Sequence, residues 1–153
     1  MMTAGIIFNL GRNMIFLREK TDTITHAESV LQPPYPGLNS LNWQVGHIAA
    51  FRDRLLHLLG EEPTLDPALA GRYGAGSDPV LGDEPGIGQL PDLMAAIDTA
   101  QERLVAAIPN ITPERAAETF GAGQFSMTIG EWVLFYTRHE AYHIGQLHAH
   151  LGA

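Results

Sequence analysis

Apolar residues recur along this chain at the three-to-four-residue spacing of amphipathic helices, and no stretch shows the strict alternation of a half-buried strand. The spacing predicts four helices, over about residues 3–20, 40–60, 91–109 and 128–150. Neither a linker nor an internal repeat divides the chain. We therefore expect an all-α fold in a single domain that spans residues 1–153.

Residues that favour helix ends lie at the predicted boundaries. Gly60 follows the second helix, as expected of a C-terminal stop. Thr128 and Glu131 have the spacing of a capping box, in which each side chain bonds the backbone N–H of the other residue, and so they mark the start of the fourth helix. The same spacing in Thr25 and Glu28 predicts a short helical turn before the chain-breaking segment QPPYPG.

A stretch rich in Gly, Pro and Asp, with the sequence GRYGAGSDPVLGDEPGIGQ, separates the second helix from the third. A loop of this length inside a compact domain commonly has a functional role. Four amphipathic helices joined by one long crossover favour a four-helix bundle. We expect the crossover, from Gly71 to Gly88, to shape the entrance to a site on that scaffold.

The composition narrows the range of partners. The 153 residues carry a formal net charge of −8, which disfavours nucleic acid because phosphate binding needs a basic surface. The nine Lys and Arg residues form no polybasic run, and no segment approaches the roughly 18 apolar residues that a membrane span requires. The chain has no cysteine, which excludes disulfides, thiolate metal ligands and a cysteine nucleophile. We expect a cytoplasmic protein that binds neither nucleic acid nor membranes.

The fourth predicted helix carries polar residues on a face that aromatic residues mark as core. At about 100° per residue, six residues fall within about 80° of one another. They are Trp132, Phe135, His139, His143, Gln146 and His150. Buried polar groups need partners, and histidines one helical turn apart can both reach a single metal ion. Histidines that merely pack are the alternative, and this helix alone does not decide between the two.

The same helix contains H-E-x-x-H, the signature of zinc proteases, in His139, Glu140 and His143. Metzincins continue this motif with Gly and His at the positions that Gln146 and Ala149 occupy here. No acidic residue follows His143 that could serve as a third ligand. A zinc hydrolase of this type is therefore the disfavoured alternative.

The second predicted helix offers a better third ligand in His47, which lies at the edge of its apolar stripe. Ligands on facing helices of a bundle converge in its core. One histidine from this helix and two from the fourth, His139 and His143, make a three-His site with open positions, as in catalytic metal centres. The remaining histidines lie near the surface, near chain breaks or near fraying ends: His26, His57, His148 and His150.

Two residues near the proposed ligands are candidates for proton handling or for orienting the ligands, namely Glu140 and Gln146. For Glu140 we favour the simpler interpretation of a solvated helix residue. Tyr136 and Tyr142 flank the histidine stripe, where either substrate contact or packing accounts for them.

The segments LNWQVGHIAAFRDRLLHLLG and TIGEWVLFYTRHEAYHIGQLHAHLG, with the glycine-rich crossover between them, resemble the DinB-like (YfiT-like) superfamily over nearly the whole chain. The resemblance implies an up-up-down-down four-helix bundle, often a homodimer. It also implies a divalent metal ion, commonly zinc or nickel, held by a triad that falls on His47, His139 and His143.

Relatives in that superfamily include thiol-dependent transferases and isomerases. The resemblance therefore implies a metal-dependent enzyme acting on a small molecule, by S-transfer with a low-molecular-weight thiol as co-substrate or by hydrolysis. The alternatives are a non-catalytic dimeric module that binds a metal or small ligand, and an interaction protein whose dimer face is its purpose. The sequence thus indicates where a reaction would take place, but it does not identify the substrate.

Overall fold

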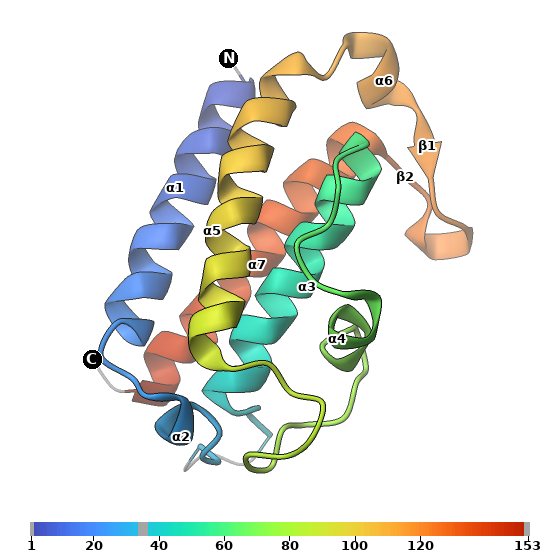
Figure 1. Ribbon diagram of the computed structural model, residues 1–153. Coiled ribbons are helices and arrows are strands. Elements are labelled where there is room, and N and C mark those ends of the chain that lie inside the picture. The colour runs from blue at the N-terminus through green and yellow to red at the C-terminus, as the bar shows by residue number, and fades with distance from the viewer. Residues whose placement is uncertain (1, 34–36, 152–153) are drawn as a thin grey trace.

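The structure, a computed structural model, describes residues 2–33 and 37–151. Within these residues the chain is mostly helical, and the predicted all-α class is confirmed (Figure 1). The four long helices are α1 (Met2–Thr21), α3 (Leu41–Leu59), α5 (Leu90–Ala107) and α7 (Ile129–Leu151). None of the described helices has both the length and the apolar character needed to cross a membrane.

Short elements connect the long helices. They are α2 (His26–Ser29), α4 (Pro67–Arg72), α6 (Pro113–Ala117), the strands β1 (Thr119–Phe120) and β2 (Met127–Thr128), and 3-10 turns at Ile108–Asn110 and Gly123–Phe125. The strands pair antiparallel, with Thr119 opposite Thr128. The hydrophobic pattern predicts neither the hairpin nor α4, because two-residue strands and a six-residue helix are too short to show a period.

The predicted helix ends agree with the structure. Gly60 ends α3 in the left-handed conformation, with φ of 82°, which suits glycine because other residues rarely adopt it. Both predicted capping boxes are present, Thr25 with Glu28 at α2 and Thr128 with Glu131 at α7. These signals are local, so the sequence alone is sufficient to read them.

The predicted up-up-down-down order of the helices is wrong. Helices α1 and α7 run in one direction, and α3 and α5 run in the opposite direction (Figure 1). Hydrogen bonds confirm that α1 and α7 are parallel, since Asn13 bonds Thr137 and the carbonyl of Phe16 contacts His148 further along both helices. An up-up-down-down order needs two long crossovers. Here the segment from α3 to α5 is the long crossover, while α2 and α6 connect neighbouring helix ends.

Helix α3 is the centre of the molecule, because it packs against α4, α5 and α7. Every residue from Leu41 to Asp53 is buried, on all faces of the helix. The sequence predicts one buried apolar stripe on this helix, whereas the structure buries every face of its first thirteen residues. The buried stretch includes polar residues that need internal partners: Asn42, Gln44, His47, Arg52 and Asp53.

A buried ion pair joins α3 to α7. Arg52 donates through Nε and Nη2 to the two carboxylate oxygens of Glu140, at 2.7 and 2.9 Å, and through Nη1 to the carbonyl of Ile97 at 3.0 Å. The two side chains are 2% and 6% exposed. The interpretation of Glu140 as a solvated residue is therefore wrong, because α3 covers this side of α7 as well as the histidine stripe.

We predict that Glu140→Leu lowers the free energy of unfolding by about 3–5 kcal/mol, because Arg52 stays buried without its counter-ion. The double variant Arg52→Met/Glu140→Leu should regain most of that loss. Denaturant unfolding of the metal-free protein measures both. As the control, Glu118→Leu removes an exposed pair with Arg115 and should change stability by less than about 1 kcal/mol. Equal losses in Glu140→Leu and Glu118→Leu would contradict the prediction.

Candidate metal centre

Three imidazoles meet between α3 and α7. The Nε2 atom of His139 lies 3.1 Å from Nε2 of His47 and 3.2 Å from Nε2 of His143. One ligand atom from each residue lies within 4.8 Å of the other two. The structure therefore brings together the three histidines that the sequence singles out, and a single metal ion could be held among them.

The spacing of the nitrogen atoms suits a tetrahedral ion. Zinc binds histidine nitrogen at about 2.0–2.1 Å, which places two ligand nitrogens about 3.3 Å apart at the tetrahedral angle. The two Nε2 separations in the triad are 3.1 and 3.2 Å. The ligand atoms of His47 and His143 lie within 4.8 Å of each other, so these two side chains would move closer together around one ion.

The outer nitrogen atoms of two histidines have acceptors that fix the proton on the far side of the ring. His47 donates from Nδ1 to the carbonyl oxygen of Tyr73 at 2.7 Å, and His143 donates from Nδ1 to Oε1 of Gln146 at 2.9 Å. Both Nε2 atoms therefore present lone pairs towards His139. A single proton on His139 can satisfy only one of them, whereas a cation satisfies all three nitrogens.

Burial keeps these rings neutral. It lowers the pKa of His47 and of His143 to about 4, and in each case a nearby histidine of the triad adds to the effect. Burial also lowers the pKa of His139. Neutral imidazole is the form that binds metal, so the triad is ready to coordinate an ion at neutral pH.

Aromatic rings hold the imidazoles in place. Trp43 stacks on His47 with ring centres 4.5 Å apart. His139 lies between Phe51 and Phe135, with centres 4.5 and 5.6 Å away and nearly parallel planes. Phe135 is 38% exposed, so it covers the site from outside and is not a core residue, contrary to its predicted place on a buried stripe.

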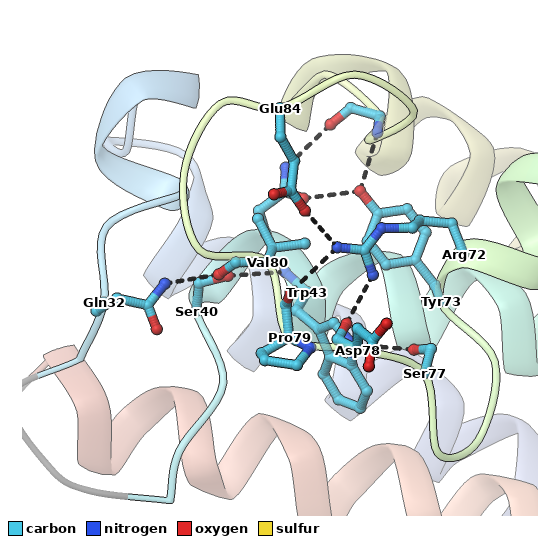
Figure 2. A network of polar contacts seen from close by, with 12 residues as sticks. Gln32, Ser40, Trp43, Arg72, Tyr73, Ser77, Asp78, Pro79, Val80 and Glu84 are labelled. Atoms are coloured by element: carbon cyan, nitrogen blue, oxygen red, sulfur yellow. Dashed lines mark hydrogen bonds and ion pairs between the residues drawn. The ribbon is translucent and has the colours of Figure 1, made fainter.

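The crossover reaches the centre through two residues, Tyr73 and Ser77. The hydroxyl of Ser77 accepts from the indole N–H of Trp43 at 3.1 Å (Figure 2). The carbonyl of Tyr73 accepts from His47. Arg72, which directly precedes Tyr73, ties this end of the loop to residues beyond Ser77 by donating to oxygen atoms of Asp78, Pro79 and Glu84. Gln32 adds a bond to the carbonyl of Val80 at 2.6 Å. The loop from Gly71 to Gly88 thus contacts His47 directly, contacts Trp43, which stacks on His47, and covers the start of α3.

Tyr73 is fully buried against α3. Its hydroxyl donates to Asn42 at 2.7 Å and accepts from the backbone N–H of Gly88 at 2.9 Å. Its ring lies so close to Gly46 that a Cβ atom there would stand 2.4 Å from it. The hydrophobic pattern and the motifs of the sequence do not predict a role for Tyr73 or Gly46. A glycine inside a strong helical pattern is the signal that could have indicated such a close approach.

The two remaining candidates have different surroundings. Gln146 bonds His143 through Oε1 and donates through Nε2 to the hydroxyl of Tyr142 at 3.0 Å. Glu140 instead uses both carboxylate oxygens on Arg52. A general base of the H-E-x-x-H type needs a free carboxylate at the ion, so the zinc-hydrolase alternative has no support here.

The other histidines stand apart from the triad. His57 is exposed on α3. His26 accepts from the backbone N–H of Leu90 at 3.2 Å and so fixes the start of α5, while His148 contacts the carbonyl of Phe16 on α1. The side chain of His150 lies outside the described part of the chain.

An all-α protein with three convergent histidines between two helices falls in the class of helical proteins that could hold a metal ion. The chain matches the family model of the DinB superfamily over residues 17–147 and belongs to that superfamily. The "crystal structure of the conserved protein of locus from Enterococcus faecalis" has a similar fold. The superposition of the two has a TM-score of 0.74 at 16% sequence identity, and it covers 99% of this chain and 98% of that chain. No curated protein matches the sequence.

We predict that Gly46→Ala weakens zinc binding by about 10- to 100-fold, because displacing Tyr73 removes the acceptor that orients His47. Competition with a chromogenic chelator measures the affinity. Gly11→Ala, on α1, is the matched control, because a Cβ atom at this position would have no neighbouring atom within 4 Å. Unchanged affinity in Gly46→Ala would show that the carbonyl of Tyr73 does not orient the ligand.

We also predict that the metal-free protein loses stability as pH falls from about 6.5 towards 4. The folded state binds protons on His47 and His143 less readily than the unfolded state does. The unfolded chain therefore takes up more protons in this window, and acid favours it. Thermal unfolding across the window measures the slope, which should become shallower in His143→Gln. A slope unaffected by that change would contradict the assignment.

Proposed function

We propose that this protein is a divalent-metal-dependent enzyme built on the four-helix bundle of the DinB-like fold. His47, His139 and His143 would hold the ion, and zinc or nickel suits imidazole ligands. The substrate is a small molecule, transformed by thiol-dependent S-transfer or by hydrolysis. When bound, the ion would lower the pKa of a coordinated thiol or water and so supply a nucleophile at neutral pH.

The observation that carries this proposal is the set of three neutral, convergent histidines without a fourth protein ligand. Among the described residues, the group of possible metal ligands contains these three alone. Structural zinc sites normally close all four positions with protein ligands, whereas catalytic sites keep one open for water or substrate. The ligand count therefore favours chemistry over a purely structural role.

The composition supports an external thiol as co-substrate. These 153 residues contain no cysteine, so any thiolate ligand to the ion has to arrive with a second molecule. The residues around the triad would orient that step. Gln146 fixes the ring of His143, and the rings of Phe51 and Phe135 exclude water from the faces of His139.

We also propose that the protein forms a homodimer. Phe8 and Ile15 on α1 are 66% and 51% exposed, although large apolar side chains are usually covered. An interface on this face would leave the triad between α3 and α7 open to substrate.

Elemental analysis of untagged protein tests the centre. We expect about one divalent ion per chain, loss of that ion in His47→Ala, and retention in His57→Ala and His148→Ala. Full metal content in His47→Ala would show that α7 alone holds the ion. No metal in the wild-type protein, under several growth supplements, would favour a module that binds an organic ligand.

Cobalt-substituted protein tests the chemistry. We expect a low-molecular-weight thiol to produce a sulfur-to-metal charge-transfer band, because the open position accepts thiolate. The same thiol should then be transferred to an electrophile in a metal-dependent assay. A cobalt spectrum that no thiol changes would favour hydrolysis over S-transfer. Inactivity in both an S-transfer assay and a hydrolysis assay would contradict the proposal that the protein is an enzyme.

A further inference from the structure

A groove opens beside the candidate metal centre, between α3, α4, the first turns of α7 and the β1–β2 hairpin. Helix α4 and the hairpin lie on the same side of the molecule (Figure 1). The volume of the groove is about 770 Å³, within the range of small-molecule sites. The residues that line it are mainly apolar, and four of them carry large aromatic side chains: Phe51, Phe120, Trp132 and Tyr136. Such a lining fits a ligand with an aromatic or branched apolar group.

The groove and the triad share a wall. Phe51 lines the groove, and its ring centre lies 4.3 Å from that of His47 and 4.5 Å from that of His139. Tyr136, which also lines the groove, packs edge-on against Phe51 at 5.4 Å. A molecule in the groove would therefore lie one aromatic ring away from the metal ligands.

One cation in the groove is available to a ligand. Arg54 is exposed, and its guanidinium lies 5.5 Å from the ring centre of Phe51. It makes no hydrogen bond or ion pair within residues 2–33 and 37–151. The neighbouring carboxylate of Asp53 is already occupied by the N–H groups of Thr64 and Leu65 and by the Thr64 hydroxyl.

This arrangement differs from that of other arginines in the chain, many of which are paired. Arg18, Arg52, Arg72 and Arg115 each contact a carboxylate. In a chain with a net charge of −8, an unpaired guanidinium at the rim of an aromatic groove is poised for an anion from outside. A planar guanidinium matches a carboxylate with two parallel hydrogen bonds.

We propose that the groove binds a small organic carboxylate, with its apolar body against the aromatic walls and its carboxylate on Arg54. This deepens the proposed function and rests on it, because the groove would hold the non-reacting part of a substrate whose reactive group reaches the ion. Binding energy from such a remote part can be used to orient the reacting group.

The test uses 3-phenylpropanoate and its uncharged counterpart 3-phenylpropanamide as probes of the zinc-loaded protein. The two indole N–H signals of ¹⁵N-labelled protein report on different places. Trp132 lines the groove and donates to the carbonyl of Phe120, whereas Trp43 stacks on His47. We expect the carboxylate to shift the Trp132 signal and to bind about tenfold more tightly than the amide.

Two variants separate Arg54 from general charge effects. Arg54→Gln should remove the preference for the carboxylate over the amide. Arg12→Gln should keep it, because Arg12 also lies over an aromatic ring, Phe16, but on α1 and away from the groove. Ala75→Phe fills the groove from an exposed position and should weaken both probes. Equal binding of the two probes, or unchanged binding in Arg54→Gln or Ala75→Phe, would overturn the proposal.

Repeating the titration after chelation separates this inference from the proposed function. A carboxylate preference that survives chelation supports the groove whatever the elemental analysis finds. If that analysis finds no metal in the purified protein, the metal enzyme is rejected and the groove is retained. A shift confined to the Trp43 signal that disappears on chelation means that the carboxylate binds the ion, and this result overturns the groove.

Discussion

The buried ion pair between Arg52 and Glu140 is the constraint on which the rest of the structure depends. Two charges inside a helical core are tolerated only when each is fully bonded, so α3 and α7 can approach in one register. Glu140 directly follows His139, and Arg52 lies little more than one turn beyond His47. The register of α3 and α7 that pairs the charges is therefore also the one that brings the imidazoles together.

Much of the fold is readable from local signals. The capping pairs at Thr25 and Thr128, and the stop at Gly60, need only neighbouring residues, and the structure has each of them. The triad is also within reach, since His139 and His143 are one turn apart and His47 faces them from another helix. The directions of the helices cannot be predicted in this way. They depend on how many of the connecting segments run the full length of the molecule, and no local signal shows that number.

What the sequence cannot indicate is contact between distant segments. The solvated interpretation of Glu140 fails because nothing near it in sequence reveals Arg52, 88 residues away. The acceptor for His47 is a backbone carbonyl, at Tyr73, and every residue has one, so no residue type marks it. The groove likewise combines residues from α3, from the stretch around α4, from β1 and from α7, and Arg54 looks like an ordinary surface arginine until its surroundings are known.

The separation of the triad along the chain gives an ion there a mechanical meaning. His47 and His139 are 92 residues apart, so an ion that binds both would close a loop of more than half the chain. Such a link acts as a reversible cross-link, and closing a long loop removes much of the freedom of the unfolded chain. Metal supply and folding would then be coupled by mass action, with the resistance of the chain to unfolding following the free concentration of the ion.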